Sequence, residues 1–104
     1  MIHHSAAWAA LDAHKSEVPH MRELFAGDTE RFSRFSLQDC GLLVDYSKHR
    51  ITRKTMELLC ALAREAGLEA QRAAMFEGQH INSTEDRAVL HTALRAPSDA
   101  RIYV

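Results

Sequence analysis

The sequence INSTEDRAVLHTALR, residues 81–95, carries the strongest structural signal in this chain of 104 residues. Asn82 is placed to cap a helix, and Glu85 follows three residues later, which is the spacing of a capping box. Pro97 marks the end of the pattern, because proline cannot continue a helix. The run therefore predicts a helix that presents one stripe of residues: Asp86, Val89, Leu90, Ala93 and Leu94.

Two further helices are predicted immediately before this run. Thr52 caps the longer one, which continues to Ala66 and ends at Gly67. A shorter helix follows over about residues 69–77. On a helical wheel, the apolar residues of the longer helix cover far more than the stripe of about 100° that a surface helix needs. We therefore expect a homodimer or higher oligomer in which this helix, or the hairpin edge described next, is buried between chains.

The first half of the chain predicts two more helices and a β-hairpin. Ser5 begins a helix that ends before Pro19, and Pro19 opens a short second helix that Gly27 closes. In residues 36–46, strand-forming residues flank Asp39-Cys40-Gly41, which is typical of a hairpin with a short glycine-containing loop.

These elements predict an α+β fold that is mainly helical, with five or so short helices and one β-hairpin. The length fits a single segment, residues 1–104. A net charge of −1 with interleaved acidic and basic residues gives no case for a nucleic-acid or membrane partner. No apolar run is longer than that at 58–63, which is far shorter than the roughly 18 residues of a membrane helix, so we expect a cytoplasmic protein.

The cysteines and histidines do not form a metal-binding pattern. Cys40 and Cys60 stand among apolar neighbours and are interpreted as structural thiols, with a reactive thiol as the alternative. The sequence contains no C-x-x-C pair, and its seven histidines lack the i, i+4 spacing of a metal-binding helix. They are expected in surface or capping roles.

Three basic residues share one edge of the helix predicted over 81–95. Arg87, His91 and Arg95 are spaced i, i+4 and i+8. One interpretation is an anion site for a sugar phosphate, since guanidinium groups suit phosphate. The favoured interpretation is ion pairing with Asp86, Glu85 or a segment outside this chain.

Two other groups of residues have a functional and a structural interpretation. In Asp45-Tyr46-Ser47-Lys48, a Ser–Lys nucleophile pair is disfavoured, because neighbouring strand residues point to opposite faces. The larger aromatic residues are interpreted as core or docking residues rather than a cofactor site: Trp8, Phe25, Phe32, Phe35 and Phe76.

Several of these runs together resemble the glucose-6-phosphate isomerase family. In residues 81–95 the resemblance rests on Asn82, Thr84, Glu85, Arg87, Ala88, Val89, Leu90, His91, Ala93, Leu94 and Arg95. The run LLVDYSKHRIT at 42–52, RFSRFS at 31–36, Met75-Phe76 and Gly78 follow the family's order. The resemblance covers roughly Ala7 to Arg95.

The resemblance implies an enzyme that interconverts glucose 6-phosphate and fructose 6-phosphate through an enediol, with no metal or organic cofactor. In that family the catalytic glutamate, the ring-opening residues and the phosphate-binding loops all lie downstream of this segment. The chain is therefore expected to be an N-terminal piece without catalytic, cofactor-binding or metal-binding residues and inactive alone. Sugar phosphate would bind only in the full-length enzyme. The alternative is a free-standing helical interaction module.

Overall fold

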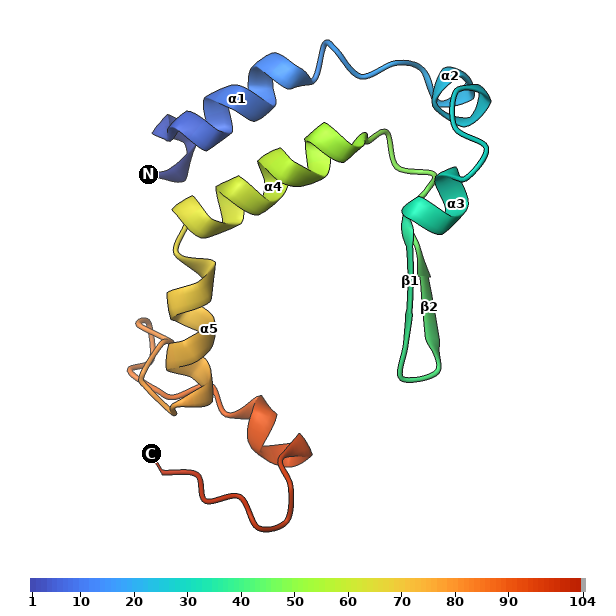
Figure 1. The fold of residues 1–104 in the computed structure, drawn as a ribbon. Coiled ribbons are helices and arrows are strands. Elements are labelled where there is room, and N and C mark those ends of the chain that lie inside the picture. Colours follow the sequence, from blue (N-terminus) through green and yellow to red (C-terminus); the bar gives the residue numbers. More distant parts are fainter. Residues whose placement is uncertain (104) are drawn as a thin grey trace. The chain divides into compact units, whose positions relative to one another are not determined.

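The computed structural model describes residues 1–103 and contains two compact units, Met1–Leu62 and a second that begins at Ala63. Within the described residues the chain forms five α-helices, two 3-10 helices and two β-strands (Figure 1). The 3-10 helices are Ile2–His4 and His91–Arg95. The expected fold class, α+β and mainly helical with one hairpin, is confirmed.

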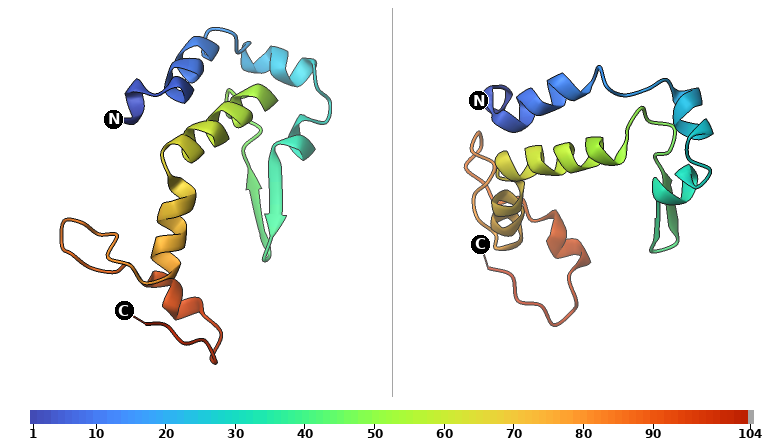
Figure 2. Two further views of the ribbon diagram at one scale, coloured as in Figure 1. Left: turned by 60° about the vertical axis from the view of Figure 1, so that its left-hand side comes forward. Right: turned by 45° about the horizontal axis from the view of Figure 1, so that its top comes forward.

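Helix α1 (Ala6–His14) lies beside α4 (Arg53–Glu65), as the views in Figures 1 and 2 both show. The Ser5 side chain caps α1 by accepting the Trp8 N–H at 3.2 Å, which confirms the predicted start. Helix α4 begins with a reciprocal capping box. The Thr52 hydroxyl accepts the Thr55 N–H at 3.3 Å, and the Thr55 hydroxyl accepts the Thr52 N–H at 2.9 Å.

Two short helices connect α1 to the hairpin. Helix α2 (Met21–Ala26) begins two residues later than predicted, because the ring of His20 rather than Pro19 stands at the cap and accepts the Arg22 N–H at 3.2 Å. It ends at Gly27, as predicted. Helix α3 (Arg31–Arg34) is a single turn that leads directly into the first strand.

The predicted hairpin is present. Strand β1 (Ser36–Asp39) pairs antiparallel with β2 (Leu42–Asp45), with Leu37 opposite Val44 and Asp39 opposite Leu42. The connecting residues Cys40 and Gly41 have φ values of 49° and 74°. Positive φ at both central residues is the signature of the type I′ turn, whose twist matches that of two paired strands.

In the second unit, α5 (Leu68–Phe76) confirms the predicted shorter helix within one residue at each end. Gly67 precedes it with φ 78°, the left-handed conformation that ends α4. No helix among the described residues is long and apolar enough to cross a membrane.

The prediction of a helix over residues 81–95 is wrong. Asn82 instead forms a two-way backbone bridge with Arg87, at 3.1 and 3.2 Å, and Asp86 takes a left-handed φ of 51°. The Asn82 side chain does accept the Glu85 N–H at 3.2 Å, but it closes a loop instead of starting a helix. Only residues 91–95 form helical structure, as a 3-10 helix in which Leu94 is 89% exposed. A short amphipathic helix needs a packing partner for its apolar stripe, and none covers Leu94 among residues 1–103.

The buried core is small. Among residues 1–103, the buried apolar side chains are Ala7, Val18 and Phe35, all in the first unit. Four polar residues are buried beside them: His14, Arg31, Ser47 and Thr55. Buried polar contacts therefore contribute to holding the first unit together.

Candidate functional site

Arg31 is a buried charged residue that connects two parts of the first unit. Its side chain is only 2% exposed, and it donates three hydrogen bonds to backbone carbonyls of the segment between β2 and α4. The Nε–H binds the Ser47 carbonyl at 2.8 Å, and the two terminal nitrogens bind those of His49 at 2.7 Å and Ile51 at 3.0 Å. One guanidinium group thus fixes the path of the chain into α4.

Two aromatic rings complete the surroundings of this guanidinium. Its central carbon lies 4.6 Å from the centre of the Phe35 ring and 5.4 Å from that of Phe25. Both distances fall in the range of cation–π contacts. Phe35 is buried and meets Tyr46 edge-to-face, with ring centres 5.8 Å apart. The Arg31 charge is therefore stabilised by carbonyl dipoles and aromatic faces.

Ser47 has a structural role and does not form a nucleophile pair with Lys48. Its hydroxyl donates to an Asp45 carboxylate oxygen at 2.7 Å, and its N–H donates to the same oxygen at 2.9 Å. These two bonds hold the pKa of Asp45 below its ordinary value. Ser47 is buried whereas Lys48 is exposed, and both lie in the turn after β2. The Ser47 hydroxyl stabilises this turn.

His14 joins α1 to α4. It is 5% exposed, with Nε2 lying 2.7 Å from the Thr55 hydroxyl and Nδ1 3.1 Å from the Glu17 carboxylate. Lys54 also donates to Glu17, at 2.8 Å. The hydrogen bond from Lys54, followed by that from His14, lowers the pKa of Glu17. His14 is therefore a buried contact residue, and the surface or capping role expected for histidines is wrong at this position.

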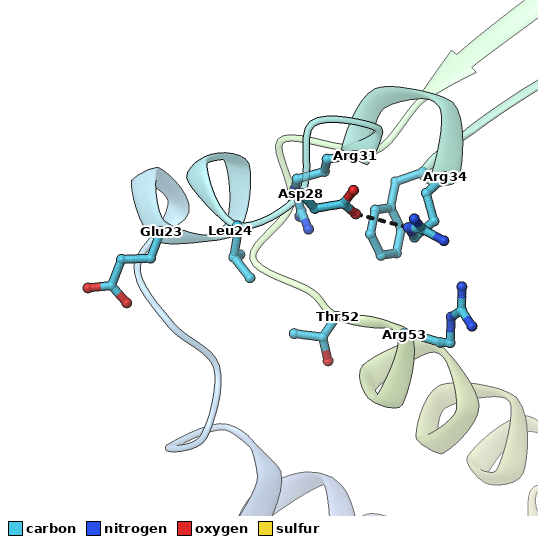
Figure 3. Close-up of a pocket in the computed structure, with 9 residues that line it drawn as sticks. Glu23, Leu24, Asp28, Arg31, Arg34, Thr52 and Arg53 are labelled. Atoms are coloured by element: carbon cyan, nitrogen blue, oxygen red, sulfur yellow. Dashed lines mark hydrogen bonds and ion pairs between the residues drawn. The ribbon is translucent and has the colours of Figure 1, made fainter.

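An open cavity of about 550 Å³ lies beside Arg31, between α2, α3 and the start of α4 (Figure 3). Asp28 and Arg34 form an ion pair across 2.9 Å on its wall. This contact lowers the pKa of Asp28 and raises that of Arg34. The Glu23 carboxylate points away from the other labelled side chains (Figure 3), and the Thr52 hydroxyl caps α4.

The paired and cationic groups on the wall of this cavity are not suited to proton transfer. A general acid or base needs a pKa near neutrality and must reach the substrate proton. Asp28 is ionised and paired, and guanidinium groups do not give up their protons. The arrangement binds chain segments together, and the absence of catalytic residues from the segment stays a prediction.

Arg87, His91 and Arg95 do not share one helix edge, because the predicted helix is absent. Arg87 lies in the bridged loop, with a terminal nitrogen 3.8 Å from the Glu85 carboxylate, in agreement with the ion-pair interpretation. Both of these side chains are exposed, so the pair adds little stability. His91 and Arg95 line a separate, mainly apolar cavity of about 490 Å³ within the second unit, together with Met75, Phe76, Thr92, Ala96, Pro97, Ala100 and Ile102.

The cysteines and most of the aromatic residues are more exposed than the sequence suggested. Cys40 and Cys60 are free and exposed, so they do not pack among apolar neighbours as the interpretation as structural thiols expected. Cys40 lies in the hairpin turn, and Cys60 lies on an exposed part of α4. Among the aromatic residues named above, only Phe35 is buried within the described chain. Among residues 1–103 no group of three His, Cys, Asp or Glu side chains could hold a metal ion.

Three carboxylates with lowered pKa values make stability depend on pH. Glu17, Asp28 and Asp45 each bind protons less readily in the folded chain than in the unfolded chain. Their contribution is present above their unfolded pKa values and is lost as the pH falls through the folded ones. We expect the urea midpoint to fall below about pH 4.5, the ordinary pKa of a glutamate.

Urea titrations at several pH values measure the pH dependence of the midpoint. They compare Glu17→Gln with Glu57→Gln, a control substitution in α4. Glu17→Gln should reduce the difference between the midpoints at pH 7 and pH 3. A parent chain whose midpoint stays constant down to pH 3 would contradict the assignment.

Comparison with known proteins identifies the family. The model for the family described as phosphoglucose isomerase matches residues 45–104. Glucose-6-phosphate isomerase from Shewanella baltica (strain OS223) is 57% identical over 102 residues, which cover 98% of this chain and 19% of that relative. The chain belongs to the phosphoglucose isomerase family. The resemblance read from the sequence is thereby confirmed.

Other isomerases match over similar spans. Glucose-6-phosphate isomerase from Shewanella oneidensis (strain MR-1) is 60% identical over 91 residues, covering 88% of this chain and 17% of the relative. That from Shewanella pealeana (strain ATCC 700345 / ANG-SQ1) is 56% identical over 99 residues, covering 95% of this chain and 18% of the relative. The chain thus spans about a fifth of the length of the curated isomerases it matches.

Sequence reasoning missed the two residues that organise the first unit of this isomerase-family chain. Arg31 entered only as part of the run RFSRFS, and no contact partner was predicted for His14. Their partners lie far along the chain: 16 to 20 residues away for Arg31, and 41 residues away for the hydroxyl that faces His14. A local pattern carries no signal for such pairings.

Proposed function

We propose that this chain is the N-terminal segment, residues 1–104, of a cytoplasmic glucose-6-phosphate isomerase. The full-length enzyme would interconvert glucose 6-phosphate and fructose 6-phosphate. The observation that carries the proposal is 57% identity to a glucose-6-phosphate isomerase over 98% of the chain. An unrelated helical interaction module would give no reason for such identity.

The proposed role of the segment is structural. Its buried charged and polar groups bind other parts of the segment: Arg31 binds three carbonyls, and Ser47 binds Asp45. Proton transfer between the two sugar carbons and binding of the sugar phosphate would then belong to the remaining four-fifths or so of the enzyme. No cofactor is needed for an aldose–ketose isomerisation of this kind.

The isolated chain is expected to be inactive. Purified chain of verified intact mass should show no conversion of fructose 6-phosphate to glucose 6-phosphate in a coupled dehydrogenase assay, because its acidic groups are paired or solvent-exposed. A mock purification from the same host controls for contaminating isomerase. Turnover above that control would contradict the structural role.

We also propose that the isolated chain self-associates. Thr55 is the one buried residue of α4 among those described, while Leu59 is 42% exposed and Cys60 is exposed as well. Large apolar surfaces seldom remain in water. Light scattering at tens of micromolar should therefore give a mass above the 11.7 kDa of one chain, rising with concentration. A constant monomer mass would contradict this.

A further inference from the structure

The β-hairpin carries more apolar surface than its surroundings cover. Leu42, Leu43 and Val44 follow one another in β2 and are 68%, 58% and 54% exposed, and Leu37 in β1 is 63% exposed. A strand with one face in water normally alternates apolar and polar residues, whereas an unbroken apolar run is typical of a strand covered on both faces. The sequence of β2 thus fits a buried strand, and the fold exposes it.

The register places apolar side chains on both faces of the hairpin. Leu37 and its partner Val44 share one face with Leu42, while Leu43, opposite Gln38, lies on the other. Within residues 1–103 the sheet has no third strand, so both outer edges are unpaired. A two-stranded sheet without a covering layer is marginally stable in water.

The hairpin is nonetheless built as a preformed element. Its turn has the type I′ geometry described above, and its base is closed by a hydrogen bond from the Tyr46 N–H to the Phe35 carbonyl at 2.9 Å. Phe35 is buried against Arg31, which also holds the chain that leaves β2. Figures 1 and 2 show the strands projecting beyond α3, away from α1. A preformed element loses little conformational freedom on binding.

We infer that the hairpin, residues 36–45, is a docking element whose two faces are covered by the part of the isomerase chain outside this segment. The inference rests on the proposed function. In the relatives, the chain outside the matched segment is about four times as long as the segment itself. This further chain can supply a covering layer. Covalent connection gives such a layer an effective concentration in the millimolar range, above that of a second copy at micromolar concentration.

A full-length chimaera tests the inference. In it, the matched segment of the Shewanella baltica isomerase is replaced by this chain, and hydrogen exchange of the peptide 36–46 is compared with that in the dilute, isolated chain. We expect exchange in the chimaera to be slower by about tenfold or more, since buried strands open far less often than exposed ones.

Each outcome decides between the alternatives. An active chimaera in which peptide 36–46 exchanges as fast as in the isolated chain overturns the docking inference and leaves the proposed function standing. If the protection of peptide 36–46 from hydrogen exchange disappears when the chimaera is diluted, the hairpin is covered by a second copy of the chain. This outcome also overturns the docking inference. A folded chimaera without isomerase activity contradicts the proposed function, and this inference with it.

Substitutions in the chimaera locate the contact. Leu37→Thr with Val44→Thr keeps two good strand formers but removes apolar surface from one face. This double variant should restore faster exchange in peptide 36–46 and lower the melting temperature of the chimaera. Lys48→Thr, at an exposed position in the turn after β2 and outside the hairpin, is the control and should change neither. Equal behaviour of the double variant and the control would show that the apolar face makes no contact.

Discussion

Replacement of Arg31 by methionine is expected to lower the free energy of unfolding of the first unit by roughly 3 kcal/mol or more. Methionine preserves much of the volume but leaves the carbonyls of Ser47, His49 and Ile51 without their donor. Each unsatisfied buried carbonyl costs about 1–3 kcal/mol, and water can compensate for part of this at the more exposed positions. The segment between β2 and α4 would lose its main attachment.

Urea unfolding followed by circular dichroism measures the change. Arg34→Met on the same helix is the control, because Arg34 is more exposed and its pair with Asp28 is worth at most about 1 kcal/mol. Arg31→Lys should fall between the two, since one ammonium group cannot reproduce the planar fork of a guanidinium. An Arg31→Met midpoint equal to that of Arg34→Met would contradict the connecting role given to Arg31.

Phe35→Ala is expected to lower the free energy of unfolding by roughly 3 kcal/mol. The ring is 4% exposed, contacts Tyr46 edge-to-face and forms one side of the Arg31 site. Phe32→Ala is the control on the same helical turn, and its half-exposed ring should cost less than about 1 kcal/mol.

The effects of Arg31→Met and Phe35→Ala on the free energy of unfolding should also be coupled. Phe35 and the Arg31 guanidinium are in direct contact, so the double variant should lose less stability than the sum of the single variants. Additive losses in the same urea titrations would show that the cation–π contact contributes nothing beyond the burial of each side chain.

Local signals in the sequence predicted most of the secondary structure. The caps of Ser5 and Thr52 and the turn at Gly41 act within a few residues, so a single sequence contains them completely. The helix expected over residues 81–95 was the exception. Its cap bond from the Glu85 N–H to Asn82 forms, but an apolar stripe without a partner surface does not hold a helix together.

The tertiary contacts were beyond sequence reasoning. Nothing in the run RFSRFS distinguishes Arg31, which is buried, from Arg34, which forms a surface ion pair. The exposure of Cys60 and of the hairpin leucines was missed for a related reason: an apolar residue indicates burial without indicating which chain segment supplies the cover. In a segment that spans about a fifth of its relatives, that cover need not lie within the segment.

The isomerase activity of the chimaera tests the central claim most directly. The claim is that this chain serves as the structural N-terminal segment of a glucose-6-phosphate isomerase whose catalytic groups lie elsewhere. The chimaera should convert glucose 6-phosphate to fructose 6-phosphate at a rate comparable to that of the unaltered Shewanella baltica enzyme, while the isolated chain shows no turnover. A well-folded chimaera without activity, or an isolated chain that turns over the substrate, would contradict it.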